Sequence, residues 1–165
     1  MLIALTGFMG SGKTTVGRIL SDALGCPFMD LDEAVVAASG RSIPDLFATE
    51  GEAGFRKREL DALRKVLSRY ASSTAVLALG GGTLTTPAAA ALIREKTVCI
   101  FLDAPLETLL SRLEGQKNGR PLADADIARR YLSRQETYRQ TAHVILQTEG
   151  LSPDEVADEI IISAL

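Results

Sequence analysis

The sequence contains no tryptophan, a single histidine, His143, and only two cysteines, Cys26 and Cys99. Because these few side chains show no zinc-type spacing, a metal site of the His/Cys kind is excluded. A general base in any reaction at this protein must therefore be a carboxylate. Both cysteines lie in short apolar runs, which is typical of small buried thiols in a reducing compartment. His143 opens the apolar run 143–146 and is interpreted as a strand-end residue.

Long apolar runs and an excess of positive charge are also missing. No stretch approaches the roughly 20 apolar residues that span a bilayer, and the run Met1–Leu5 is too short for a signal-peptide core. The 18 Lys and Arg residues are outnumbered by 21 Asp and Glu residues. We therefore expect a cytoplasmic protein without a membrane or nucleic-acid partner. With 46% hydrophobic residues and 24% charged residues, the composition is that of an ordinary globular α/β protein.

The sequence GFMGSGKT at residues 7–14 is a complete phosphate-binding loop of the G-x-x-x-x-G-K-[ST] type. It follows the apolar run 2–5 and precedes an amphipathic helical pattern that stops at Gly25, which is the required order of strand, loop and helix. Lys13 is expected to reach the β- and γ-phosphates, and the Thr14 hydroxyl to bind Mg²⁺. The other expected nucleotide contacts in this segment are Gly10, Ser11, Gly12 and Thr15. The motif predicts a site for a nucleoside triphosphate.

Five apolar, β-prone segments alternate with helical patterns along the chain. They are Leu2–Leu5, Pro27–Met29, Ala75–Leu79, Val98–Leu102 and His143–Leu146. This alternation predicts a three-layer α/β/α fold of the P-loop class with a central five-stranded parallel sheet. A length of 165 residues suits one domain.

Two segments depart from the simple alternation. Residues 32–69 read as helices throughout, over Asp32–Ser39, Ile43–Ala48 and Gly51–Ser68, and we expect this excursion to carry a second substrate. Residues 114–126 are polar, contain two glycines and a proline, and are expected to form a lid loop. The remaining residues, 1–31, 70–113 and 127–165, would form the core of the domain.

Two groups of residues lie where ligands bind in open α/β sheets, at the carboxyl ends of strands, and a third candidate opens the last helix of the excursion. Asp30 and Asp32 follow the second strand and suit metal binding and proton acceptance, although an aspartate there also suits a helix cap. Gly80-Gly81-Gly82 follows the third strand, and Arg56 offers a planar fork for a carboxylate. A flexible turn and a solvated helix residue are the alternatives for these two. Asp103, which imitates a Mg²⁺-binding aspartate, is interpreted as a helix-start residue before Pro105.

Taken together, these motifs resemble the shikimate kinase family, a group of small P-loop enzymes related to nucleoside monophosphate kinases. The matching segments, in the family's order, are Gly7–Lys13, Asp30–Asp32, Gly40–Ile43, Gly51-Glu52 with Phe55-Arg56, Gly80–Gly82, Arg120–Leu122, and Arg134 with Tyr138. The resemblance implies Mg²⁺-dependent transfer of the γ-phosphoryl group of ATP to the 3-hydroxyl of shikimate, a step of aromatic amino acid biosynthesis.

The resemblance also implies roles for individual residues. Asp32, Arg56, Arg134 and the loop Gly80-Gly81-Gly82 would hold shikimate. Arg120 in the lid would contact the ATP phosphates and act in catalysis with Lys13 and Asp32, while Arg112 would lie beside adenine. Asp30 would join Thr14 at the metal. The protein is expected to act as a monomer.

Two departures from the family pattern concern details around the lid and adenine. Residues 120–123 read Arg-Pro-Leu-Ala where a second leucine is common, and Gln147 stands where many members carry aspartate. Two other functions remain open. A kinase of another small hydroxy acid, such as gluconate, has the same requirements, and a non-catalytic nucleotide switch is the other alternative. The sequence lacks the Asn-Lys-x-Asp motif by which GTP switches recognise their base.

Overall fold

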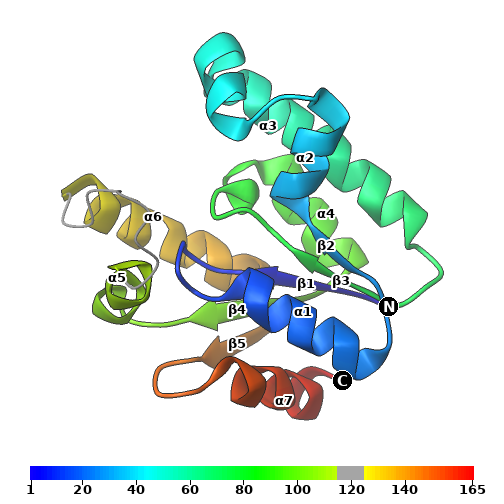
Figure 1. Ribbon diagram of the computed structural model, residues 1–165, viewed down its shortest axis with the longest axis vertical. Coiled ribbons are helices and arrows are strands. Elements are labelled where there is room, and N and C mark those ends of the chain that lie inside the picture. The colour runs from blue at the N-terminus through cyan, green and yellow to red at the C-terminus, as the bar shows by residue number, and fades with distance from the viewer. Residues whose placement is uncertain (115–124) are drawn as a thin grey trace.

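One parallel β-sheet forms the centre of the protein, with the strand order β2-β3-β1-β4-β5 (Figure 1). A computed structural model describes residues 1–114 and 125–165. The strands in these ranges are β1 (Leu2–Thr6), β2 (Phe28–Asp30), β3 (Ala75–Ala78), β4 (Val98–Asp103) and β5 (Val144–Gln147). All five expected strands are confirmed, and so is the parallel pairing throughout the sheet.

Helices cover both faces of the sheet and complete the three layers (Figure 1). They are α1 (Lys13–Leu24), α2 (Leu31–Ser39), α3 (Ile43–Arg69), α4 (Pro87–Lys96), α5 (Leu106–Glu114), α6 (Ala125–Thr141) and α7 (Pro153–Ala164), with a short 3₁₀ helix η1 (Thr83–Thr85). In the described ranges, no helix is both long enough and apolar enough to cross a membrane.

The central strand β1 is buried on both faces, as expected for a parallel sheet between helices. Ile3 and Leu5 pack with residues of α1 and α7 in one apolar cluster. Leu2 and Ala4 belong to the opposite cluster, which includes residues of α3, α4 and α6. Because side chains alternate along a strand, this single segment holds both helical layers in place. The phosphate-binding loop follows β1 directly and is therefore anchored at the middle of the sheet.

The helical excursion between β2 and β3 consists of α2 and α3. Helix α3 is broken at Gly51, whose φ of 70° and ψ of −179° lie outside the helical region. Glycine adopts this positive φ without the cost that a side chain would bring. The break agrees with the expected pair of helices on either side of residue 50, and it redirects the chain so that the second part of α3 carries Arg56 toward the sheet edge.

Two expectations need correction: the bounds of the lid loop and the interpretation of Asp103 as a helix-start residue. Residues 115–124 of the expected lid, with Arg120, lie outside the described residues, and the two ends of the expected loop are helical. Glu114 ends α5, while Ala125 and Asp126 begin α6, where an acidic first turn suits the helix dipole. Asp103 does not start a helix. It ends β4, and its carboxylate accepts a hydrogen bond from Gln147 Nε2 at 3.0 Å.

Candidate active site

The phosphate-binding loop owes its shape to glycines at two turns with positive φ, one of which is also crowded. Gly10 and Gly12 have φ values of 79° and 89°, which side-chain-bearing residues rarely adopt. A Cβ atom at Gly10 would also lie only 2.8 Å from the carbonyl oxygen of Leu109. Helix α1 starts immediately afterwards, and in the described structure no side chain caps its first turn. The N–H groups and the positive end of the helix dipole are therefore free to face phosphate oxygens.

Lys13 turns back over this loop. Its ammonium donates hydrogen bonds to the carbonyl oxygens of Gly7 (2.7 Å) and Phe8 (3.1 Å). Desolvation by the surrounding protein lowers the pKa of Lys13 to about 8, and the nearby carboxylates of Asp32 and Asp30 only partly offset this effect. A polyanion bound beside Lys13 would therefore stabilise the charged ammonium form of this lysine.

This pKa predicts a pH-dependent affinity for nucleotide. Bound phosphates favour the ammonium, so they raise the pKa of Lys13 above its value of about 8 in the free protein. Below pH 8 the lysine is charged in both states. Above pH 8 the free protein loses the proton and must recover it on binding, so the affinity should fall by up to about tenfold per pH unit.

Calorimetric titration with ATP in buffers of different ionisation enthalpy checks this expectation. At pH 9 the protein should take up close to one proton per ATP bound, and at pH 7 this uptake should disappear. Equal ATP affinity at pH 7 and pH 9, with no proton uptake at either, would contradict the pKa assigned to Lys13.

The two aspartates after β2 have different surroundings. Asp30 caps α2, because its Oδ1 accepts hydrogen bonds from the backbone N–H groups of Asp32 (2.9 Å) and Glu33 (3.3 Å). Its Oδ2 accepts a hydrogen bond from the Thr14 hydroxyl at 3.1 Å. The capping interpretation is therefore correct for Asp30, and the same carboxylate also lies beside the phosphate-binding loop.

Asp32 lies in the first turn of α2, next to the triglycine loop. A Cβ atom at Gly80 would lie 3.0 Å from Asp32 Oδ1. Desolvation raises the pKa of Asp32, and the charges of Asp30 and Glu59 add to this increase. A carboxylate of raised pKa at a cleft has the properties of a proton acceptor.

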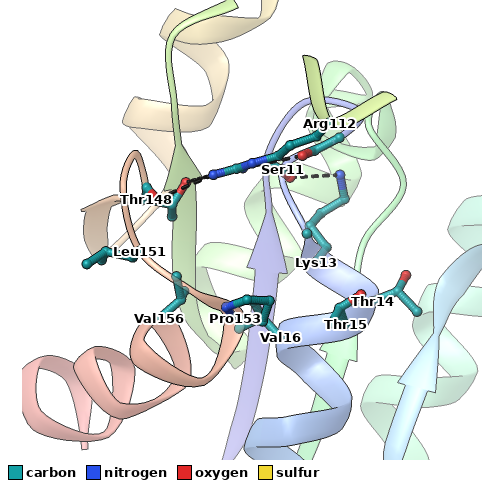
Figure 2. A pocket seen from close by; sticks show the side chains of 12 residues that line it. Ser11, Lys13, Thr14, Thr15, Val16, Arg112, Thr148, Leu151, Pro153 and Val156 are labelled. Carbon is teal, nitrogen blue, oxygen red and sulfur yellow. Dashed lines mark hydrogen bonds between the residues drawn. The ribbon is translucent and has the colours of Figure 1, made fainter. Parts of the chain in front are cut away.

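A cleft of about 430 Å³ opens beside the phosphate-binding loop (Figure 2). Its walls include Gly10, Ser11, Gly12, Lys13, Thr14, Thr15 and Arg112, which are all the expected nucleotide contacts except Arg120. Leu151 and Pro153 add an apolar wall from the segment after β5. The Arg112 guanidinium crosses the cleft to Thr148, donating to its carbonyl oxygen at 3.3 Å, and also donates to the carbonyl oxygen of Gly10 at 3.4 Å. Sequence reasoning missed this apolar wall, because Leu151 and Pro153 belong to no motif.

The three glycines after β3 form a surface that other parts of the site contact closely. A Cβ atom at Gly81 would lie 3.4 Å from Arg134 Nη1 and 4.0 Å from both the carbonyl oxygen of Gly7 and the backbone nitrogen of Met9. One at Gly82 would clash with the Arg56 guanidinium and lie 3.1 Å from Arg134 Nη2. Gly80-Gly81-Gly82 is thus the common boundary of the phosphate-binding loop and the arginine pair.

Glu59 is a residue of this site that sequence reasoning missed. It is 1% exposed, and its carboxylate accepts hydrogen bonds from Arg56 Nη1 (2.9 Å) and the Thr83 hydroxyl (2.9 Å). Glu59 lies three positions after Arg56 on α3, so both lie on the same helix face. That spacing was the available signal, but an acidic residue three positions after an arginine is common on helix surfaces.

Arg134 approaches the same place from α6. Burial lowers the pKa of Arg134, and the positive charges of Arg130 and Arg56 contribute to the shift. Within the described residues, the buried Nε of Arg56 has no hydrogen-bond partner. Two guanidinium groups around one glycine loop, with the Glu59 and Asp32 carboxylates beside them, make a charged site suited to a carboxylate that both arginines can bind.

The structure therefore brings the predicted residues into two adjoining groups. The nucleotide group surrounds Lys13, and the acceptor group comprises Asp32, Arg56, Gly80, Gly81, Gly82 and Arg134. Across residues 1–114 and 125–165 there is no cluster of three or more His, Cys, Asp or Glu side chains that could hold a metal by itself.

A phosphate-binding loop at the centre of a parallel α/β sheet, with a charged acceptor pocket beside it, defines a P-loop phosphotransferase. The comparison with protein families agrees with this class: the model described as shikimate kinase matches residues 9–164. The chain belongs to the shikimate kinase family. It is an ATP-dependent kinase.

Individual relatives support the family membership over the whole length. The shikimate kinase of Enterococcus faecalis is 40% identical over 164 residues, which cover 96% of this chain and 95% of that protein. Among solved structures, the shikimate kinase of Aquifex aeolicus has a TM-score of 0.87 with 36% identity, covering 99% and 95% of the two chains. The enzyme of Acinetobacter baumannii, solved in complex with shikimate, has a TM-score of 0.85 with 34% identity, covering 97% of this chain and 90% of that one.

Proposed function

We propose that the protein transfers the γ-phosphoryl group of ATP to the 3-hydroxyl of shikimate, giving shikimate 3-phosphate and ADP in the route to chorismate and the aromatic amino acids. The observation that carries this proposal is the position of the triglycine loop. Gly81 lies close to the phosphate-binding loop at Gly7 and Met9 and close to Arg134, while Gly82 contacts Arg56. A small acceptor held by the arginines therefore lies next to the γ-phosphate of a nucleotide held by Lys13.

The assignment of shikimate rests on chemical complementarity. Shikimate has one carboxylate and a set of vicinal hydroxyls on a small ring. Arg56 and Arg134 offer planar donor forks for the carboxylate, and Asp32 offers an acceptor for the hydroxyls. When the reacting hydroxyl attacks phosphorus, its proton passes to the Asp32 carboxylate, whose raised pKa suits that task. The helical region 32–69 would thus be the shikimate-binding part of a single kinase domain.

ATP would occupy the cleft of about 430 Å³ that adjoins this pocket. Backbone N–H groups of the loop around Gly10–Thr15 would bind the β-phosphate, with Lys13 on the β- and γ-oxygens. Arg112 and the apolar Leu151 and Pro153 would hold the adenine base. Lys13 acts in the transition state, because charge develops on the oxygens that it contacts. Arg120 would add a further cation to the phosphates, a role that rests on the family resemblance alone.

The residues present fit a Mg²⁺ ion at this site. The Thr14 hydroxyl and the Asp30 carboxylate are 3.1 Å apart, and both are oxygen donors of the hard kind that Mg²⁺ prefers. Bound there, Mg²⁺ would neutralise negative charge on the ATP phosphates. Asp30 keeps the Thr14 hydroxyl oriented toward the same point and, as the α2 cap, fixes the start of the helix that carries Asp32.

We further infer a monomer that works in the cytoplasm, where ATP is available. The free thiols of Cys26 and Cys99 agree with a reducing compartment.

Substrate selectivity is the direct test of the proposed function. The protein should consume ATP rapidly with shikimate and Mg²⁺, and only weakly with gluconate or nucleoside monophosphates. A poorer acceptor leaves polar groups of the site, such as Asp32, without a hydrogen-bond partner, and a polar site rejects such analogues by about 10⁴-fold or more in kcat/KM. Steady-state kinetics with the three acceptors measure the ratio. Equal or faster turnover with gluconate or a nucleoside monophosphate would reject shikimate as the substrate.

A further inference from the structure

Tyr138 on α6 has a buried hydroxyl that none of the proposed catalytic steps uses. The residue is 1% exposed, and its ring packs against Phe101 with the ring centroids 5.0 Å apart. Its hydroxyl donates a hydrogen bond to the carbonyl oxygen of Gly81, the middle glycine of the triglycine loop. The bond joins α6 to β3's loop across 57 residues of sequence, directly at the boundary of the acceptor pocket.

Arg134 precedes Tyr138 by four residues, so both side chains leave the same face of α6. The Arg134 guanidinium lies against the same loop, with Nη1 3.4 Å from the Cβ position of Gly81 and Nη2 3.1 Å from that of Gly82. The hydroxyl of Tyr138 and the guanidinium of Arg134 therefore meet the same glycine loop.

The other side of the loop is held by α3. The buried carboxylate of Glu59 accepts hydrogen bonds from Arg56 and from Thr83, which directly follows the glycines. Tyr138 thus binds the middle glycine, and Glu59 binds Thr83, the residue that follows the three glycines. Glycines lack side chains that could fix their backbone, so hydrogen bonds to their carbonyl oxygens do so: Thr83 donates to Gly80, Thr85 to Gly82, and Tyr138 from another helix to Gly81.

The Tyr138 hydroxyl remains a donor over the whole working pH range. Burial raises the pKa of Tyr138 to about 12, although the positive charges of Arg134 and Arg56 oppose this shift. The Gly81 carbonyl thus keeps its partner under all conditions in which the enzyme acts.

We propose that Tyr138 is a positioning residue for the acceptor substrate: its hydrogen bond to Gly81 sets the spacing between the triglycine backbone and the two arginines that bind the substrate carboxylate. The inference rests on the proposed function for the identity of the acceptor. It adds that α6 contributes a tyrosine as well as Arg134 to the acceptor pocket. A misplacement of about 1 Å in such a pocket costs up to about a hundredfold in rate or affinity.

Tyr138→Phe tests this role, because it keeps the ring that packs on Phe101 and removes only the hydroxyl. Tyr131→Phe is the matched control. Tyr131 lies on the same helix and also donates its hydroxyl to a backbone carbonyl, that of Ala104, at 2.9 Å, but that bond does not involve the triglycine loop. Both variants should remain folded, which circular dichroism checks.

The expected result is a split between the kinetic constants. In Tyr138→Phe the KM for shikimate should rise by roughly tenfold or more while the KM for ATP stays within about twofold. In Tyr131→Phe both constants should stay close to those of the wild type. Hydrogen exchange in the ligand-free protein should also be faster at the amides of residues 81–83 in Tyr138→Phe alone, which reports on the loop without any substrate.

The outcomes separate this proposal from the proposed function. Unchanged exchange at residues 81–83 together with an unchanged KM for shikimate would overturn the positioning role. Equal increases of the KM for shikimate in both tyrosine variants would overturn it as well, since the effect would then be a general loosening of α6. A wild-type protein inactive with shikimate would reject the proposed function, and the exchange measurement would still decide whether Tyr138 fixes the loop.

Discussion

Replacing Asp32 with asparagine should abolish most phosphoryl transfer while ATP continues to bind. Asp32→Asn keeps the shape of the side chain but removes the carboxylate beside Gly80 that we propose as the acceptor of the hydroxyl proton. Loss of a general base costs about 10²–10⁴-fold in rate. Single-turnover measurements with ATP and shikimate would give the loss in the chemical step, and calorimetry would show that ATP affinity is retained.

The neighbouring Glu33 provides a matched control. It lies one residue further along α2, and its exposed carboxylate pairs only with Arg18 in the described structure, at 3.6 Å. Glu33→Gln should leave the rate unchanged. Because the pKa of Asp32 is raised, wild-type activity should also decline on acidification at a higher pH than an ordinary aspartate would cause. Wild-type rates in Asp32→Asn would leave Asp32 as a polar residue of the first helical turn.

Lys13→Ala should reduce kcat by roughly a hundredfold or more and leave the fold intact. In the proposed mechanism the ammonium of Lys13 contacts the phosphates where charge develops, and removing one preorganised electrostatic contact costs this much in rate. Its hydrogen bonds in the free protein stay within the same loop, to the carbonyl oxygens of Gly7 and Phe8 and to Ser11 Oγ, so none of them joins Lys13 to the apolar core. Steady-state kinetics with saturating ATP and shikimate would measure the change.

Lys65→Ala is the corresponding control, since Lys65 is an exposed lysine on α3. The kcat of Lys65→Ala should equal that of the wild type. A Lys13→Ala protein of normal rate and normal circular dichroism would show that the loop around Lys13 does not act on phosphate.

The sheet was predictable because local sequence and tertiary position agree in its strands. Buried parallel strands require uninterrupted apolar residues, and the segments at 2–5, 75–79 and 98–102 are of this kind. The ends of the strands were harder to predict. Asp103 extends β4 because it pairs with Gln147 of β5 and its carbonyl oxygen accepts the Thr148 N–H at 2.9 Å, and a partner 44 residues away leaves no local signal.

The site was predictable where a residue's chemistry is tied to a local motif, as for Lys13, Thr14 and the three glycines. Arg56 was a candidate for its planar fork, but only the family resemblance favoured it over a solvated helix residue and added Arg134, since a single arginine on a helix has no distinguishing local pattern. Glu59 was missed for a related reason. Its importance comes from joining Arg56 to Thr83, and this link exists only once α3 lies across the end of β3.

The identity of the phosphorylated product is the most direct test of the proposal that shikimate is phosphorylated at its 3-hydroxyl. The protein should be incubated with ATP, Mg²⁺ and shikimate, and the products followed by phosphorus and proton NMR. We expect one phosphate monoester, whose phosphorus signal is coupled to the proton on carbon 3 of shikimate, in an amount equal to the ADP formed. ADP with free inorganic phosphate, or an ester at another hydroxyl, would contradict the placement of the acceptor between Asp32 and the two arginines.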